Sequence, residues 1–237
     1  MAISRNGSWI FVLTDQGKIL IYSSKGSLDS TIDIGNHVDQ IKAGPVDELL
    51  IVKSSKNKTV QLLALDFVKT IDISGAPFKG PADAPVVIAV FSEFQWVYCK
   101  KLVPLLEQVL DTYPDKVKIV YKNFPLQRHK YARNAAIAAL AADRQGKFWE
   151  FHDLLFENYQ KPDDPKIKEI AQQLKLDLKA FENDLKNPEI EAKVQRDFLD
   201  GQKAEVRGTP TIFVNGRMLK NRSLQGFQTL IDKELTK

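Results

Sequence analysis

Three short apolar runs, far apart in the chain, constrain its fold more than any other feature. They cover residues 85–91, 117–121 and 211–214 and are rich in Val, Ile and Phe, as buried strands are. Between them lie helical patterns, and the first forms an apolar stripe of Leu102, Leu105, Leu106, Val109 and Leu110. This order of strands and helices predicts an α/β domain that carries a helical insertion.

Polar residues mark where several of these helices begin. Asp164-Pro165 and Asn187-Pro188 each place a capping side chain just before a proline that suits the first helical turn. Ser223 is suited to cap the last helix. These signals predict three helix starts.

The only cysteine lies in the segment that joins the first apolar run to the first helix. This segment reads Phe91-Ser92-Glu93-Phe94-Gln95-Trp96-Val97-Tyr98-Cys99. Because the chain has no second cysteine, it cannot form an intrachain disulfide, and one molecule cannot perform dithiol exchange. A helix N-terminus favours a thiolate, but the effect fades within the first turn, where Cys99 lies. An inert buried thiol is therefore the default interpretation of Cys99.

The segment resembles the active site of DsbA-like proteins of the thioredoxin superfamily, which carry Cys-x-x-Cys after the same strand. Four further motifs agree with this resemblance, namely Pro104, Asn123-Phe124-Pro125-Leu126, the stretch 145–152, and Gly208-Thr209-Pro210 before the last strand. The resemblance runs from about residue 78 to residue 237. It implies a thioredoxin-like fold with a helical insertion over about 128–203, and a cis peptide bond before Pro210.

Two residues depart from the family pattern. Trp96 stands at the position of the nucleophilic cysteine, and Val97 stands where the family usually has proline. The resemblance implies a protein thiol-disulfide oxidoreductase or isomerase in which Cys99 is the resolving residue, but an indole cannot attack a disulfide. Trp96 is natural, designed, or a recoded selenocysteine, since the codon UGG differs at one base from UGU, UGC and UGA. The genomic codon at position 96 decides among these origins.

A redox-inactive peptide-binding chaperone or interaction module is the alternative function. The resemblance implies that Val97, Tyr98, Thr209 and Pro210 form the substrate-binding surface. Such a surface can pair with an extended peptide without a nucleophile. The implied partners are cysteine-containing or unfolded proteins and a redox partner protein. An assembly scaffold built on the N-terminal residues is a weaker third alternative.

Several ionisable residues are candidates for supporting roles. Glu93 and Lys122, which ends its strand, are candidates for buried groups that tune Cys99, and surface or capping roles are at least as compatible. His129 follows the Asn-Phe-Pro-Leu segment and can approach the site, although an ordinary surface position is the commoner outcome. The histidines lack metal-ligand spacing, so neither a metal nor another cofactor is expected, and a packed helix residue is expected at His152.

The charges of the chain are nearly balanced. It contains 34 Lys and Arg against 30 Asp and Glu, for a net charge of +4. This balance is too weak and too mixed to predict nucleic-acid binding. The local group of Arg128, His129, Lys130 and Arg133 could favour acidic substrates, but a solvated helix face is the more ordinary explanation.

Residues 1–75 form a different kind of sequence, with strand-like runs, turn residues and no helical period. Runs near residues 9, 18 and 30 recur at a period of about 40, which resembles two β-propeller blades in architecture. Two blades cannot close a propeller, and exposed apolar edges usually need a partner. We therefore expect a small all-β domain that pairs with another copy or protein. The alternative is a monomer whose two sheets cover each other.

The domain at 85–237 is expected to follow a linker at 76–84, which is rich in Pro and Gly. No apolar run is long enough to cross a membrane, and no secretory segment precedes Trp9. The resemblance implies the bacterial periplasm or cell envelope, with the signal peptide absent from this chain.

Overall fold

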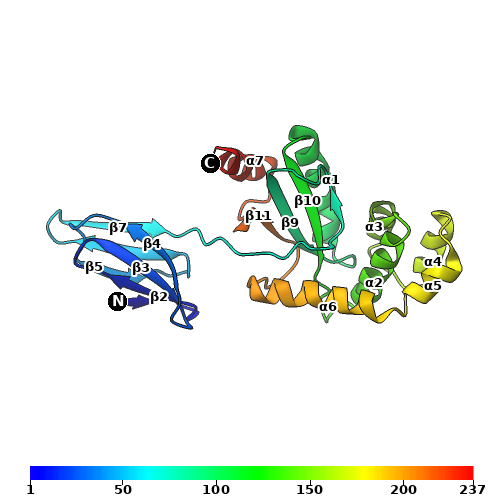
Figure 1. Cartoon of the computed structure of the whole chain (residues 1–237), viewed down its shortest axis with the longest axis horizontal. Coiled ribbons are helices and arrows are strands. Elements are labelled where there is room, and N and C mark those ends of the chain that lie inside the picture. Colours follow the sequence, from blue (N-terminus) through cyan, green and yellow to red (C-terminus); the bar gives the residue numbers. More distant parts are fainter. Residues whose placement is uncertain (237) are drawn as a thin grey trace. The chain divides into compact units, whose positions relative to one another are not determined.

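The computed structural model describes residues 1–236, which divide into two compact units. The first unit is Met1–Phe67 and the second begins at Val68. The first contains strands only, whereas the second combines strands and helices (Figure 1).

The first unit consists of two antiparallel sheets around one core. The four-stranded sheet has the order β1-β2-β3-β4, and the three-stranded sheet has the order β5-β6-β7. The strands are β1 (Ala2–Ile3), β2 (Trp9–Leu13), β3 (Lys18–Ser23), β4 (Leu28–Asp33), β5 (Gln40–Ala43), β6 (Leu49–Ser54) and β7 (Thr59–Ala64). The core joins Phe11 and Ile19 of one sheet to Leu50 and Val52 of the other.

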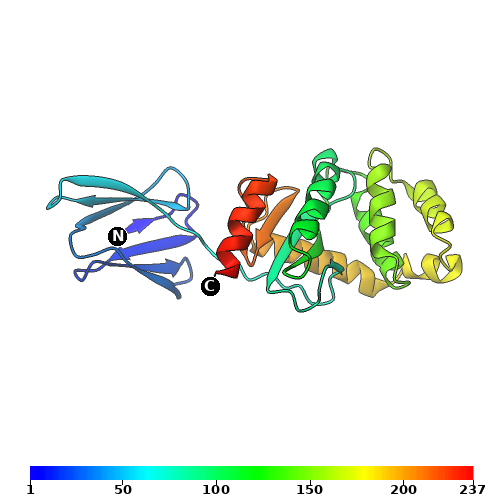
Figure 2. The ribbon, with the colours of Figure 1, turned by 90° about the horizontal axis from the view of Figure 1, so that it is seen from above.

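These sheets are not propeller-like, so that prediction is wrong. The apolar faces of the two sheets cover each other, and Figure 2 shows them as two layers, whereas propeller blades surround a central channel. The predicted repeat is also incomplete, because residues 70–74 form no strand. Ile71 packs against the core of the second unit, and the Lys69 amide donates a hydrogen bond to the Gly216 carbonyl at 2.8 Å. Residues 70–74 thus belong to the second unit and not to a repeat of the first.

The second unit is built on a five-stranded mixed sheet with the order β12-β11-β9-β10-β8. β9 (Val86–Ser92) and β10 (Val117–Asn123) are parallel along their full length, and β11 (Thr211–Val214) runs antiparallel to β9. β12 (Arg217–Met218) and β8 (Phe78–Lys79) form the edges. β8 corrects the predicted linker, because Phe78 and Lys79 pair with β10 and so belong to the sheet.

Helices cover both faces of this sheet. α1 (Val97–Thr112) and α7 (Leu224–Leu235) pack on one face, where Leu102, Val109 and Phe227 meet the strand residues. α6 (Pro188–Lys203) reaches the other face. A Cβ atom at Gly201 of α6 would lie 2.5 Å from the Phe124 ring, so glycine is needed for this close approach.

The remaining helices form an insertion between β10 and β11, as expected, and they make a separate layer in Figure 1. They are α2 (Ala132–Asp143), α3 (Phe148–Glu157), α4 (Asp164–Gln173) and α5 (Leu178–Asp184). Asn187 caps α6 and Ser223 caps α7, as predicted. α4 begins one residue earlier than predicted, because Asp163 and not Asp164 accepts the capping hydrogen bond. No helix among residues 1–236 is long and apolar enough to span a membrane.

Candidate functional site

The candidate site lies where β9 ends and α1 begins. Trp96 is the N-cap residue of α1, with extended backbone dihedrals of φ −111° and ψ 120°. No side chain caps this helix, and no acidic residue lies in its first turn. The amides at the start of a helix without such a cap favour negative charge. Position 96 is therefore where a thiolate would gain most from the helix.

Cys99 lies inside the first turn of α1 and is 1% exposed. Burial raises the pKa of its thiol, and hydrogen bonding to Ser92, the Glu93 backbone and Thr209 opposes that rise. The contribution of Thr209 is weak, because its buried hydroxyl lacks a hydrogen bond of regular geometry. Cys99 is thus a protonated, sheltered thiol at neutral pH.

The loop before β11 forms the second side of the site. The Thr209–Pro210 peptide bond is cis, in agreement with the sequence analysis. Thr211 pairs with Phe91 across the antiparallel strands, which brings this loop beside the end of β9. The Thr209 side chain is consequently near enough to the Cys99 thiol to lower its pKa, although its hydroxyl has no hydrogen-bond partner among residues 1–236. The structure therefore places Cys99 and the cis-proline loop together.

Aromatic and cationic groups surround Trp96. Its ring centroid lies 5.1 Å from that of Tyr98 and 5.4 Å from that of His129. The Arg128 guanidinium lies 5.3 Å from the Trp96 ring centroid. Trp96 and Val97 are half-buried, whereas Tyr98 is 54% exposed. The surface at the start of α1 is thus an aromatic one.

Glu93 and His129 form a pair beneath this surface. The Glu93 carboxyl is buried, interacts with His129 Nδ1, and accepts a hydrogen bond from the Gln95 amide at 2.7 Å. Desolvation raises the pKa of Glu93, and the hydrogen bonds from Gln95 and His129 oppose this rise. His129 therefore does reach the site, and its place after the Asn-Phe-Pro-Leu segment was the available signal.

Lys122 lies in a different network. It is 1% exposed, and its ammonium forms ion pairs with Asp197 at 2.8 Å and Asp200 at 2.9 Å, both on α6. It also donates to the Asp72 carbonyl at 2.6 Å. These contacts connect β10 to α6. Of the two ionisable residues predicted to tune Cys99, Glu93 raises the pKa of the thiol through its charge, whereas Lys122 is not among the groups that shift it.

Sequence reasoning did not identify two other polar groups near the thiol, Ser92 and Tyr121. Tyr121 is buried with no hydrogen-bond partner for its hydroxyl, and burial raises its pKa well above the usual value. Cys99, Ser92, Tyr121 and His152 line a cavity of about 10 Å³. His152 is packed among aromatic rings, as expected, and no cluster suited to a metal occurs among residues 1–236.

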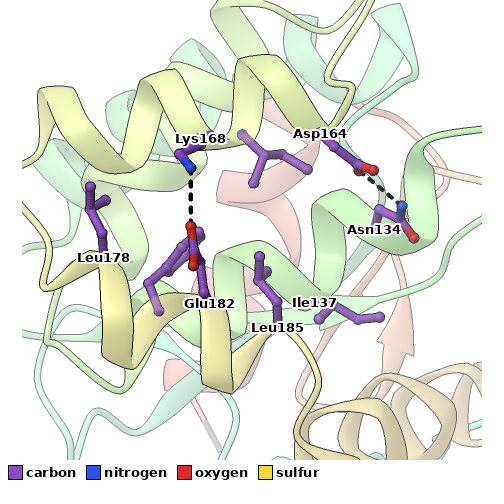
Figure 3. Close-up of a pocket in the computed structure, with 9 residues that line it drawn as sticks. Asn134, Ile137, Asp164, Lys168, Leu178, Glu182 and Leu185 are labelled. Carbon is purple, nitrogen blue, oxygen red and sulfur yellow. Dashed lines mark hydrogen bonds and ion pairs between the residues drawn. The ribbon is translucent and has the colours of Figure 1, made fainter.

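A larger cavity of about 330 Å³ lies in the helical insertion, among α2, α4 and α5 (Figure 3). Its apolar lining is Ile137, Ile167, Leu178, Phe181 and Leu185. Two polar contacts cross its rim, Lys168 with Glu182 and Asn134 with Asp164, each at 3.1 Å (Figure 3). No site residue predicted from the sequence lines it, because its walls come from three separate helices.

Comparisons of sequence agree with this geometry. Residues 74–233 match the family described as Thioredoxin. The chain is 30% identical over 198 residues to a probable disulfide bond formation protein D of Bacillus anthracis, which covers 79% of this chain and 87% of that protein. It is also 34% identical over 154 residues to a Na(+)/H(+) antiporter of Salinispora tropica. The match covers 65% of this chain and 24% of the antiporter, so the chain spans about a quarter of that relative.

Solved structures show the same fold. A thioredoxin-like oxidoreductase from Silicibacter pomeroyi has a TM-score of 0.64 and 26% identity, over 69% of this chain and 94% of that one. Oxidised BdbD from Bacillus subtilis has a TM-score of 0.64 and 25% identity, over 73% of this chain and 99% of that one. The chain therefore belongs to the thioredoxin family, and it is similar to a probable disulfide bond formation protein D and to BdbD.

Proposed function

We propose that this chain is a DsbA-like protein thiol-disulfide oxidoreductase or isomerase whose attacking residue belongs at position 96. The observation that supports this most is the placement of position 96 at the N-cap of α1, one turn from the buried Cys99 thiol. Its substrates are cysteine-containing or unfolded proteins, and a redox partner protein resets the site. With Trp96 in place, the chain performs no dithiol exchange by itself.

The chemistry requires a thiolate or selenolate at position 96. This group would attack one sulfur of a substrate disulfide, and the other sulfur would leave as a thiolate. The Cys99 sulfur would then attack the mixed disulfide, release the reduced substrate and leave an oxidised pair at positions 96 and 99. The helix N-terminus would stabilise the attacking anion by about 0.3 to 2 kcal/mol.

We propose that the residue at position 96 was a chalcogen nucleophile before its replacement. Cys99, Pro104 and the Thr209–Pro210 loop are all retained around it. Such retention fits a selenocysteine codon read as Trp, or a designed substitution. Sequencing the natural gene tests this, and UGG at position 96 would exclude recoding.

The activity test compares Trp96→Cys with the parent in insulin reduction and in reactivation of scrambled ribonuclease. We expect activity in Trp96→Cys alone, because only this variant has both an attacking and a resolving thiol. Trp96→Ser is the matched control, since it removes the indole without adding a thiol. A folded Trp96→Cys protein with no activity would contradict the proposal.

A redox-inactive peptide-binding module is the second candidate. The observation that favours it is the exposed Tyr98 beside Trp96, next to a loop whose backbone suits β-addition of a peptide. In this case the parent would suppress aggregation of unfolded proteins. Trp96→Cys would remain without exchange activity.

We further propose that the protein works in the bacterial periplasm or cell envelope and that its N-terminal unit joins two copies. Fractionation of cells that express the natural gene tests the location. Recovery only in the cytoplasm would contradict it.

A further inference from the structure

Four cations surround the start of α1, and each lies over an aromatic ring. From the charged group to the ring centroid, the pairs are Arg128 over Trp96 at 5.3 Å, Lys101 over Tyr98 at 5.5 Å, Lys100 over Tyr159 at 4.9 Å and Lys130 over Tyr131 at 5.2 Å. Among residues 1–236, none of these four cations forms a salt bridge with a carboxylate. Arg128 acts electrostatically on the buried Glu93 carboxyl, but none of the four charges is taken up by a direct ion pair in this part of the chain.

Other cations of this unit do have carboxylate partners. Arg144 pairs with Glu189 at 2.6 Å and Lys147 with Glu150 at 2.7 Å. The Glu93 carboxylate is buried and already engaged by His129. The positive charge at the start of α1 thus remains available to a ligand.

The aromatic rings connect two of these cations into one surface. The rings of Trp96 and Tyr98 are tilted against each other at 5.1 Å between centroids, and Arg128 lies over the first ring and Lys101 over the second. We call Trp96, Tyr98, Lys101 and Arg128 together the cationic rim. The helix adds partial positive charge beside the rim, because no acidic residue lies in its first turn.

We propose that the cationic rim binds an extended acidic segment of the protein substrate. This inference rests on the proposed function and adds the substrate class to it. Carboxylates of the segment pair with Arg128 and Lys101, and its apolar atoms lie on the Trp96 and Tyr98 rings. An arginine or lysine that lies over a ring can still donate hydrogen bonds outward to a carboxylate.

Fluorescence anisotropy of the full parent chain tests this, with labelled peptides of about ten residues that alternate Ser with Glu, Gln or Lys. We expect the Glu peptide to bind at least about tenfold more tightly than the Gln peptide, with weaker binding as salt rises from about 20 to about 150 mM. The double variant Arg128→Glu/Lys101→Glu should lose at least about tenfold in affinity. Lys175→Glu/Lys179→Glu, with the same charge change in the helical insertion, should retain the parent affinity.

If charge reversal prevents folding, the neutral double variant Arg128→Gln/Lys101→Gln replaces it. We expect this variant to lose less affinity for the Glu peptide than the charge-reversed one. Equal binding of the Gln and Glu peptides would overturn the inference. Tighter binding of a single-stranded oligonucleotide than of the Glu peptide would overturn it as well. Loss of affinity in the Lys175→Glu/Lys179→Glu control would show that the net charge of the chain, and not the rim, determines peptide binding. That result would also overturn the inference.

A second experiment separates this inference from the proposed redox function. Arg128→Glu/Lys101→Glu is combined with Trp96→Cys, and reduction of a disulfide in the Glu peptide is compared with reduction of the same disulfide in the Gln peptide. A selective loss with the Glu peptide supports the inference. Exchange by Trp96→Cys, together with equal binding of the Glu and Gln peptides by the parent, overturns the inference but leaves the redox function standing. Binding of the Glu peptide without exchange overturns the redox function alone.

Discussion

At the scale of single residues, the burial of Cys99 decides what the thiol can do. Burial raises its pKa and the side chain is 1% exposed, so little thiolate forms and reagents reach it slowly. We expect iodoacetamide to modify the folded parent at least about tenfold more slowly than the unfolded chain at neutral pH. Mass spectrometry over time measures this. Equal rates for the two states would show that the thiol is accessible.

The Glu93 carboxyl makes stability depend on pH. Its pKa in the folded state is raised above 4.5 by burial, so the folded state holds this proton more tightly than the unfolded state. The resulting stabilisation is complete below about pH 4.5 and is lost as the pH rises through the folded pKa. We expect the free energy of unfolding of the parent to fall relative to that of Glu93→Gln over this interval.

Urea denaturation from about pH 4.5 to about pH 7 measures this difference. Glu157→Gln is the control, because Glu157 is an exposed residue of α3. A parent that gains stability relative to Glu93→Gln as the pH rises would contradict the assignment.

Only site residues that lie close together in the sequence could be predicted from it. Trp96 and Cys99 are predictable because both lie in one contiguous motif. Ser92 and Tyr121 reach the thiol from the ends of two neighbouring strands, and nothing in their local sequence indicates this contact. The Glu93–His129 pair depends likewise on how β9 and the segment after β10 meet.

At the scale of elements, the Lys122 network fastens α6 to β10. Asp197 is fully buried, so Lys122→Met would leave its carboxylate with Lys193 as its remaining cation, at 3.1 Å. We expect a loss of about 3 to 5 kcal/mol in the free energy of unfolding, measured by urea denaturation.

Lys118→Met on the same strand is the matched control, since its ammonium donates to the Ala82 carbonyl in an exposed hydrogen bond. That variant should change stability by less than about 1 kcal/mol. Similar losses of unfolding free energy in the two variants would show that the buried ion pair of Lys122 stabilises the fold no more than the exposed hydrogen bond of Lys118.

Periodicity predicted the long elements and failed for the short ones. The apolar stripe of α1 and the runs of β9, β10 and β11 carry enough residues to show a period. β8 contains two residues, and no pattern of that length distinguishes it from a linker. Residues 70–74 alternate as a strand does, but a strand also needs a partner. The one bridge nearby joins Val68, just before this segment, to Arg217.

At the scale of the whole molecule, the four-stranded sheet of the first unit is apolar on both faces. Phe11 and Ile21 point into the core, while Ile10 and Tyr22, which pair across β2 and β3, face the other way and are not buried. An antiparallel sheet with one solvated face usually alternates apolar and polar residues. The outward face is therefore suited to a partner surface. The predicted pairing with another copy or protein remains a prediction, because the two sheets also cover each other as in the monomer alternative.

We infer that this partner is a second copy, because a mainly apolar face whose Lys18 is paired with Asp33 can complement itself under twofold symmetry. Light scattering of the parent at micromolar concentration should then give about twice the 26.8 kDa of one chain. Ile10→Lys/Tyr22→Lys places charge on the face and should yield a monomer, while Asn57→Lys in the β6–β7 turn should remain a dimer. A single species of 26.8 kDa for the parent would rule out a stable dimer and leave the face to another protein. Dimerisation that survives Ile10→Lys/Tyr22→Lys would instead place the interface elsewhere on the chain.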